Sequence, residues 1–205
     1  DAKGLSCIAK AGADWYALYQ ETYNRGLFQN LRIEQHFDER IASKKKAASL
    51  GLLLEEGLLT GFGDTLGDRV DALRRMQTLS PSQMRIMTFI PQDGAPLTRK
   101  SDEGFLPEIM TIAVMRLMNP DVLIPASLDV DGIDGLKQRL MAGANVVTSI
   151  IPPREGYAGV ANSVRDIDEG HRTAPFVKKI LGECGLRAAS EPACRRWIEE
   201  RRNKQ

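Results

Sequence analysis

The chain has 205 residues, enough for one substantial hydrophobic core, and its 42% hydrophobic content is ordinary for a globular domain. Its 28 lysines and arginines nearly balance 27 aspartates and glutamates, so no overall charge favours nucleic acid or acidic lipid. The three cysteines are scattered, and no apolar run approaches the roughly 20 residues that span a bilayer. We therefore expect a cytoplasmic protein with neither a disulfide framework nor a signal peptide.

Short strands alternate with helices along the chain, which is the pattern of parallel β-α-β units. The predicted strands cover 15–20, part of 51–61, 84–90, 122–126 and 146–151. The predicted helices cover 37–49, 65–79, 105–118, the segment between the last two strands, and about 166–184.

Two of these helices carry apolar residues at the three-to-four-residue spacing of a helix packed on one face. In helix 65–79 the stripe consists of Leu66, Val70, Leu73 and Met76. In helix 105–118 the apolar residues are Leu106, Ile109, Met110, Ala113, Val114 and Leu117. We expect both sets to face the core.

Five such units suit either an open doubly wound sheet or the second half of a (β/α)8 barrel. The loops favour the barrel, because four of the five strands are followed at once by polar residues or glycines, at 20–22, 61–64, 91–94 and 127–129. In a barrel these loops ring one mouth, and a complete barrel needs about 250 residues. We therefore predict the carboxy-terminal part of a TIM barrel over residues 1–184, followed by a basic helical appendage over 185–205.

The segment DVLIPASLDVDGIDGLKQRLMAGANVVTSIIPP, residues 121–153, is one complete β-α-β unit with polar residues where its first strand ends. Ser127 and Asp129 are two residues apart, so they share a face of that strand. The alternative is that Asp129, with Asp131, caps the following helix. Capping suits Asp131 better, and Ser127 lies too far back for that role.

Arg85 lies in the otherwise apolar segment MRIMTFI, on the same strand face as Met87. An unpaired buried charge is costly, so two interpretations stay open. Either Arg85 lies at the start of the strand with its guanidinium in water, or it points into the barrel and binds an anion. A carboxylate suits it, because the guanidinium fork makes two parallel hydrogen bonds. With Ser127 and Asp129 holding an ammonium group, these residues would form a receptor for a zwitterionic amino acid.

The remaining polar residues give weaker signals by themselves. Glu21 follows the first strand in the cluster YQET, where a capping or surface carboxylate is the simpler interpretation. Arg40 lies on the next helix, where arginines are usually solvated or pair with a neighbour such as Asp38 or Glu39. His36 and His171 have no partners at ligand spacing, so no metal site is predicted.

In order along the chain, the segments ALYQETYN, LR…FDER, EGLLTGFGDT, MTFIPQDGAPL, residues 116–153 and GVANSVRDIDE resemble the methylornithine synthase family. The resemblance runs from the first residues to about Arg172. Members of this family are radical S-adenosylmethionine enzymes of pyrrolysine biosynthesis, related to biotin synthase.

The resemblance implies a radical S-adenosylmethionine (β/α)8 barrel whose 4Fe–4S cluster, fed by an electron donor, generates a 5'-deoxyadenosyl radical. That radical starts the conversion of L-lysine to (3R)-3-methyl-D-ornithine. By position, Glu21 and Arg40 correspond to contacts with the amino and carboxylate groups of S-adenosylmethionine. Arg85, Ser127 and Asp129 correspond to residues that grip the amino-acid end of the product.

The chain departs from the family in one respect, because it contains no CxxxCxxC motif for the cluster. The family's earlier strands are also absent, so the resemblance implies that an amino-terminal half-barrel is missing and that this chain alone is inactive. Two alternatives to the lysine mutase stay open. One is a related radical enzyme acting on another amino acid, and the other is a non-catalytic truncated half-barrel.

Overall fold

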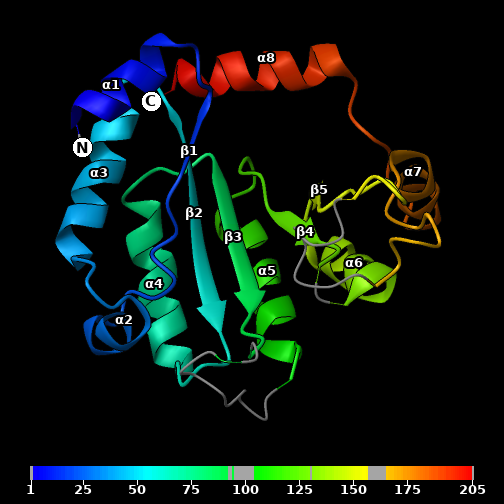
Figure 1. Cartoon of the computed structure of the whole chain (residues 1–205), viewed down its shortest axis with the longest axis horizontal. Coiled ribbons are helices and arrows are strands. Elements are labelled where there is room, and N and C mark those ends of the chain that lie inside the picture. The colour runs from blue at the N-terminus through cyan, green and yellow to red at the C-terminus, as the bar shows by residue number, and fades with distance from the viewer. Residues whose placement is uncertain (1, 92–93, 95–103, 130, 157–164, 205) are drawn as a thin grey trace. The chain divides into compact units, whose positions relative to one another are not determined.

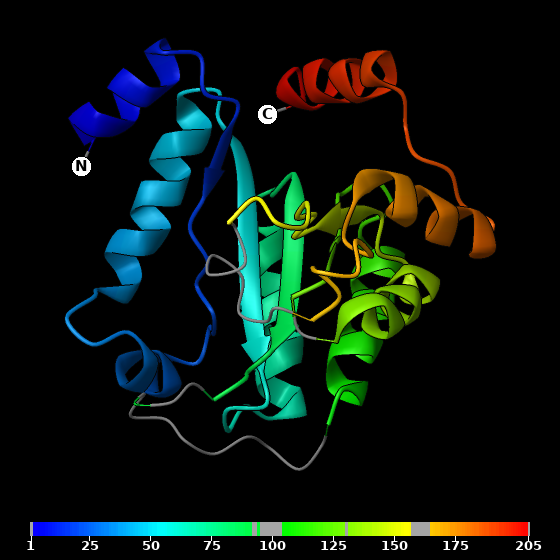
Figure 2. The same cartoon turned by 45° about the vertical axis from the view of Figure 1, so that its right-hand side comes forward.

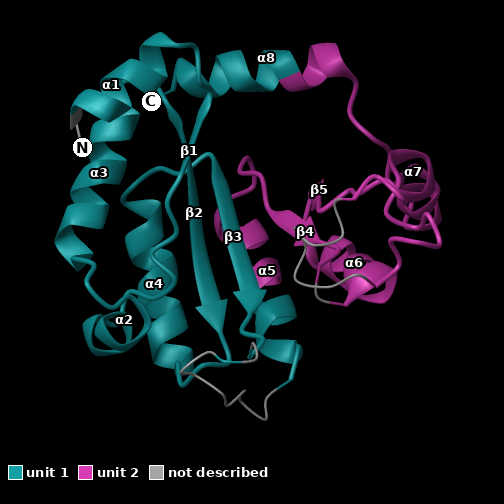
Figure 3. Ribbon diagram, viewed as in Figure 1, with its two compact units in different colours: residues 1–111, 195–205 teal, residues 112–194 magenta. Residues whose placement is uncertain are grey.

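The computed structural model describes residues 2–91, 94, 104–129, 131–156 and 165–204. Its helices and strands alternate along the chain, as predicted (Figure 1). They divide into two compact units, coloured separately in Figure 3. Unit 1 comprises residues 1–111 and 195–205, and unit 2 comprises residues 112–194.

Unit 1 is a three-stranded parallel sheet with helices. In chain order its elements are α1 (Ala2–Lys10), β1 (Trp15–Ala17), α2 (Arg25–Leu31), α3 (Phe37–Ser49), β2 (Leu53–Thr60), α4 (Leu66–Gln77) and β3 (Gln83–Thr88). The strand order is β1-β2-β3, with Trp15 opposite Leu53 and Gly57 opposite Arg85. Helix α3 packs on β2, and α1 packs on α3 (Figure 2). The predicted parallel β-α-β units are thus confirmed in this unit.

The sheet of unit 1 has two different faces, because successive strand side chains point to opposite sides. We call the covered face the set of buried residues Leu54, Glu56, Leu58, Met84, Ile86 and Thr88. We call the open face the partly exposed residues that alternate with them, which are Glu55, Leu59, Arg85 and Met87. A buried apolar cluster that joins Leu5, Ala47 and Leu54 packs α1 and α3 against the covered face. Polar groups on the open face therefore remain within reach of a ligand.

Local sequence signals explain where the helices begin. Asn24 accepts hydrogen bonds from the backbone N–H groups of Gly26 and Leu27 and so caps α2, a helix that the sequence analysis did not predict. Thr65 and Asp68 form a reciprocal capping box at the start of α4. Helix α4 therefore begins within one residue of its predicted start.

The predicted apolar stripe of α4 is wrong at two of its four positions. Leu66 is 71% exposed and Val70 is 42% exposed, whereas Ala72, Leu73 and Met76 are buried. The buried residues of α4 are Arg69, Ala72, Leu73 and Met76, so the buried face is rotated from the predicted one.

Helix α5 (Leu106–Met118) shows the same deviation. Leu106, Met110 and Leu117, which were expected to face the core, are 66%, 57% and 82% exposed. The buried side chains on this helix include Ile112 and Met115, together with the polar Glu108. Spacing alone could not choose among the overlapping stripes of an apolar helix.

Unit 2 contains the β-α-β unit predicted for residues 121–153. It consists of β4 (Pro125–Ser127), α6 (Gly132–Ala142) and β5 (Val146–Thr148), and the strands are parallel with Ser127 opposite Thr148. Helix α6 ends at Gly143, whose φ of 116° is a left-handed conformation that favours glycine. The final helix of the unit, α7 (Ala174–Glu183), is shorter than the predicted 166–184. It starts at a Thr173 cap followed by Pro175, and residues 165–173 form turns instead.

The carboxy-terminal helix α8 (Glu191–Arg202) lies within the basic helical segment predicted over 185–205. Ser190 caps this helix, since the N–H of Ala193 donates to Ser190 Oγ over 3.4 Å. Further along, the ring of Trp197 stacks on Trp15, with centroids 6.1 Å apart. Arg201 donates to the carbonyl of Pro81 over 2.8 Å. These contacts lie at the amino ends of β1 and β3. The predicted boundary between the barrel portion and the appendage at residue 185 stays a prediction.

Of the predicted polar loop at 91–94, residues 92–93 lie outside the described residues. Among the described helices, none is both long and apolar enough to cross a membrane.

Candidate functional site

The first part of the candidate site is the loop that follows β1, where Glu21 continues the sheet. Its N–H donates to the carbonyl of Gly57 over 3.0 Å, and its own carbonyl accepts from Leu59 over 2.9 Å. Glu21 adopts a left-handed φ of 68°, which is uncommon for a residue other than glycine. Such a conformation persists only where its surroundings enforce it, and it is frequent at ligand sites.

The carboxylate of Glu21 is buried and pairs with Arg32. The expectation of a surface carboxylate is therefore wrong. Burial raises the pKa of Glu21, and the nearby Arg32 guanidinium opposes that rise. The charged form of this side chain is thus held in a place that disfavours it, as is common for groups that bind ligands.

Arg40 approaches the same loop from α3. One terminal nitrogen donates to the carbonyl of Tyr19, and the other donates to Gln35 Oε1 over 2.6 Å. Burial lowers the pKa of the Arg40 guanidinium, and its Nε is buried without a hydrogen-bond partner. Of the two acidic neighbours considered as partners of Arg40, Asp38 pairs instead with Arg25 over 2.5 Å.

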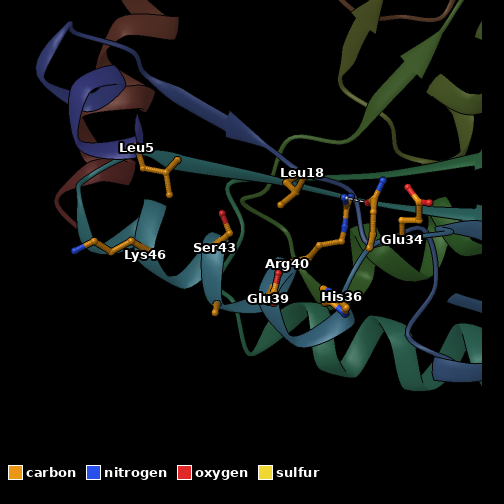
Figure 4. Close-up of a pocket in the computed structure, with 10 residues that line it drawn as sticks. Leu5, Leu18, Glu34, His36, Glu39, Arg40, Ser43 and Lys46 are labelled. Carbon is orange, nitrogen blue, oxygen red and sulfur yellow. Dashed lines mark hydrogen bonds between the residues drawn. The ribbon is translucent and has the colours of Figure 1, made fainter. Parts of the chain in front are cut away.

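Arg40 also lines a pocket of about 550 Å³ beside α3. Figure 4 shows His36, Arg40 and Ser43 on the α3 side of this pocket, and Leu18 from the segment after β1. A cavity that contains an incompletely bonded guanidinium suits an anionic group of a ligand.

Beneath the loop lies a buried polar cluster that the sequence analysis did not identify. Glu56, on the covered face of β2, is 1% exposed and pairs with Lys44 of α3, which is also 1% exposed. The Glu56 carboxylate also accepts from the N–H of Gln20 over 2.7 Å and from the hydroxyl of Tyr23 over 3.1 Å. Lys44 in turn donates to Gln20 Oε1 over 2.8 Å.

We call Lys44, Glu56, Gln20 and Tyr23 the Glu56 cluster. It binds residues on both sides of Glu21, so it holds the loop in place. The sequence contained a signal for it, because an acidic pair interrupts the otherwise apolar run LLLEEGLLT. On a strand one of two adjacent acids must point into the covered face.

Arg85 is placed in the middle of β3, on the open face. Its Nε donates to Glu55 Oε1 over 3.1 Å, and the side chains of Arg85 and Glu55 are 14% and 13% exposed. The hydroxyl of Tyr19 donates to the same oxygen over 2.6 Å. The interpretation of an Arg85 head in water at the strand start is therefore wrong. The anion that it binds here is Glu55, and a ligand contact stays a prediction.

In unit 2, Ser127 and Asp129 lie close together, and Ser149 connects them. The Oγ atoms of Ser127 and Ser149 are 3.2 Å apart, and Ser149 donates to Asp129 Oδ2 over 2.8 Å. The other Asp129 oxygen pairs over 3.0 Å with Arg172, whose side chain is fully buried. Sequence reasoning missed Ser149 and Arg172, because neither stands out in its local pattern.

The capping role expected for Asp131 is wrong. Asp131 occupies the N-cap position of α6 but makes no side-chain cap. Its carboxylate instead accepts from Arg139 over 3.3 Å. Asp166 takes over the cap by accepting from the N–H of Ile133 over 3.1 Å.

The described part of the chain offers no place for an iron–sulfur cluster. Within it, no group of three or more histidine, cysteine or acidic side chains is arranged to hold a metal. Cys7 and Cys194 are exposed on α1 and α8, and Cys184 is the C-cap residue of α7.

No protein-family model matches this chain. It is 46% identical over 180 residues to the 3-methylornithine synthase of Methanosarcina barkeri, which is 88% of this chain and 51% of that protein. Subunit HydE of the [FeFe] hydrogenase maturase from Thermotoga maritima is 32% identical over 197 residues, or 93% of this chain and 57% of that protein.

The crystal structure of a methylornithine synthase matches with a TM-score of 0.88 and 43% identity, covering 96% of this chain and 58% of that one. The fold is therefore part of a (β/α)8 barrel of the radical S-adenosylmethionine class, and this confirms the predicted fold class. Within that class, the chain belongs to the methylornithine synthase family. It spans about half the length of the relatives that it matches.

Proposed function

We propose that this chain is the carboxy-terminal part of a radical S-adenosylmethionine mutase that converts L-lysine to (3R)-3-methyl-D-ornithine for pyrrolysine biosynthesis. The observation that carries the proposal is the 46% identity to 3-methylornithine synthase over 180 residues. Lysine and methylornithine are isomers, so the reaction rearranges the carbon skeleton without net gain or loss of atoms.

In this proposal Glu21 and Arg40 hold S-adenosylmethionine. The buried carboxylate of Glu21 suits its ammonium group, and the unpartnered Nε of Arg40 suits an anionic group such as its carboxylate. When bound and reduced, this cofactor supplies the radical that starts the reaction. The Glu56 cluster contributes by fixing the loop that presents Glu21.

The amino-acid end of the substrate is assigned to Arg85, Ser127 and Asp129. The Arg85 guanidinium on the open face provides donors for the carboxylate. Asp129 and Ser127 provide oxygens for the ammonium group, although the two Asp129 oxygens already accept from Ser149 and Arg172. Arg172 and Ser149 thus fix the orientation of Asp129 in this proposal.

The described residues do not fit a 4Fe–4S cluster, so the proposal assigns the cluster ligands and the remaining strands of the barrel to polypeptide outside this chain. The chain alone is then expected to be inactive, and the whole enzyme also requires an electron donor.

The test is to express the full-length protein that contains this chain, reconstitute its cluster anaerobically, and supply L-lysine, S-adenosylmethionine and a reductant. We expect methylornithine in excess over 5'-deoxyadenosine, because an isomerisation returns the abstracted hydrogen to the rearranged product radical. Deoxyadenosine without methylornithine would refute the lysine assignment, and a panel of other amino acids would then identify the related substrate. If neither product forms with any amino acid, the chain is not part of a radical enzyme.

A further inference from the structure

The open face of the sheet carries an organised group of three polar side chains, Tyr19, Glu55 and Arg85. Glu55 Oε1 accepts both from the hydroxyl of Tyr19, over 2.6 Å, and from Nε of Arg85, over 3.1 Å. The Cζ atom of Arg85 lies 5.8 Å from the centre of the Tyr19 ring. We call these residues the Glu55 group.

The bond to Glu55 uses one particular edge of the Arg85 guanidinium. A guanidinium has a side edge that includes Nε and an end edge formed by its two terminal NH2 groups. Because Glu55 engages Nε, it fixes both the rotation of the planar group and the direction in which the end edge points. That end edge matches the two oxygens of a carboxylate.

Tyr19 restrains Glu55 in the same way. Burial raises the pKa of Tyr19, with the hydrogen bond to Glu55 as a second cause, so the phenol stays a neutral donor to the carboxylate. The ring lies directly on Gly57, since a Cβ at that position would be 2.7 Å from Cδ1 of Tyr19. Gly57 is the β2 residue opposite Arg85. The absence of a side chain there makes room for the tyrosine beside the arginine.

The ion pair between Arg85 and Glu55 also determines the net charge of this part of the open face. Glu55 compensates the charge of Arg85, so the site attracts anions weakly by net charge. Recognition then depends on hydrogen-bond donors of Arg85 whose orientation is fixed before the ligand binds, and this favours a planar carboxylate over other anions.

We propose that Glu55 and Tyr19 are positioning residues that aim Arg85 at the α-carboxylate of the substrate and so select amino acids over simple amines. This inference rests on the proposed function, because it takes the ligand of Arg85 to be an amino acid. It adds residues that act through Arg85 and need not touch the ligand themselves.

The experiment compares ligands that differ in one group. The full-length protein, loaded with S-adenosylmethionine but without a reductant, is titrated calorimetrically with L-lysine and with cadaverine, which is lysine without its carboxylate. For Glu55→Gln we expect the Kd for lysine to rise about tenfold while the Kd for cadaverine stays the same. Tyr19→Phe should show the same change to a smaller extent, and it provides a second test if Glu55→Gln folds poorly.

A double variant separates positioning from independent binding. If Glu55 acts through Arg85, the variant Glu55→Gln with Arg85→Gln should bind lysine no more weakly than Arg85→Gln alone. Asp71→Asn serves as the control, because it removes a carboxylate from the exposed ion pair with Arg75 on α4 and should retain the lysine preference.

Two outcomes would overturn the inference. One is an unchanged ratio of lysine to cadaverine affinity in both Glu55→Gln and Tyr19→Phe. The other is that Glu55→Gln specifically weakens the preference for lysine over ε-aminocaproate, which lacks the α-amino group, because Glu55 would then bind the ammonium itself. A wild-type protein that binds neither lysine nor S-adenosylmethionine would instead refute the proposed function.

Discussion

Two acidic clusters lie on opposite faces of β2, one around Glu55 and the other around Glu56. The residues are neighbours in the chain, but Glu55 is on the open face with a 13% exposed side chain and Glu56 is 1% exposed beneath α3. Glu55 accepts both of its hydrogen bonds on one oxygen, whereas Glu56 uses both of its oxygens. Because successive strand side chains point to opposite faces, Glu55 and Glu56 have different surroundings and different roles. The first is suited to a ligand site, and the second holds the loop that carries Glu21.

The largest expected effect comes from breaking the Glu56 cluster. Lys44→Met or Glu56→Gln leaves a buried group without its partner, so each should reduce the free energy of unfolding by about 3–5 kcal/mol. The double variant should lose less than the sum of the two, as measured by denaturant unfolding. The exposed pair of Arg75 and Asp71 is the control, and Arg75→Ala should cost less than about 1 kcal/mol. Equal losses at the two pairs would show that the Glu56 cluster does not support the fold.

A smaller effect is expected at the boundary of the open face. Gly57→Ala forces a Cβ to within 2.7 Å of the Tyr19 ring, so it should destabilise the protein by about 1–3 kcal/mol and weaken lysine binding. Gly182→Ala is a matched control, because a Cβ in this helical position meets nothing within 4 Å. It should leave binding unchanged and stabilise the protein by about 0.5–1 kcal/mol. If both variants behave alike in unfolding and binding, Gly57 does not shape the Glu55 group.

The smallest effect concerns Glu21, which the Glu56 cluster holds in place. Its pKa is raised by burial above the ordinary value of 4.5, with Arg32 opposing the rise. A raised pKa contributes stability below the unfolded value, and that contribution is lost as pH rises through the folded pKa. Wild type should therefore lose stability relative to Glu21→Gln as the pH increases from about 4.5 upward. Chemical unfolding at several pH values tests this, and parallel curves would mean that burial does not disfavour the Glu21 charge.

Much of this arrangement could be read from the sequence. The alternation of strands and helices, the loops at the strand ends, and the residues Arg85, Ser127 and Asp129 follow from patterns within a few residues, whereas Glu21 was singled out by the family resemblance. What the sequence could not supply were partners brought together by the fold. Lys44 and Glu56 are twelve residues apart, and Asp129 and Arg172 are forty-three apart. The predicted buried faces of α4 and α5 were wrong for a related reason. An apolar helix has several possible buried faces, and only tertiary packing determines which of them faces the core.

The difference between the two faces of β2 is tested most directly by a crystal structure of the full-length protein with S-adenosylmethionine and L-lysine bound. We expect the lysine carboxylate on the end edge of Arg85, with the bond from Arg85 Nε to Glu55 retained and the Glu56 cluster unchanged. A lysine carboxylate bound away from Arg85, or an Arg85 that has left Glu55 to reach it, would contradict the assignment of the open face to substrate recognition.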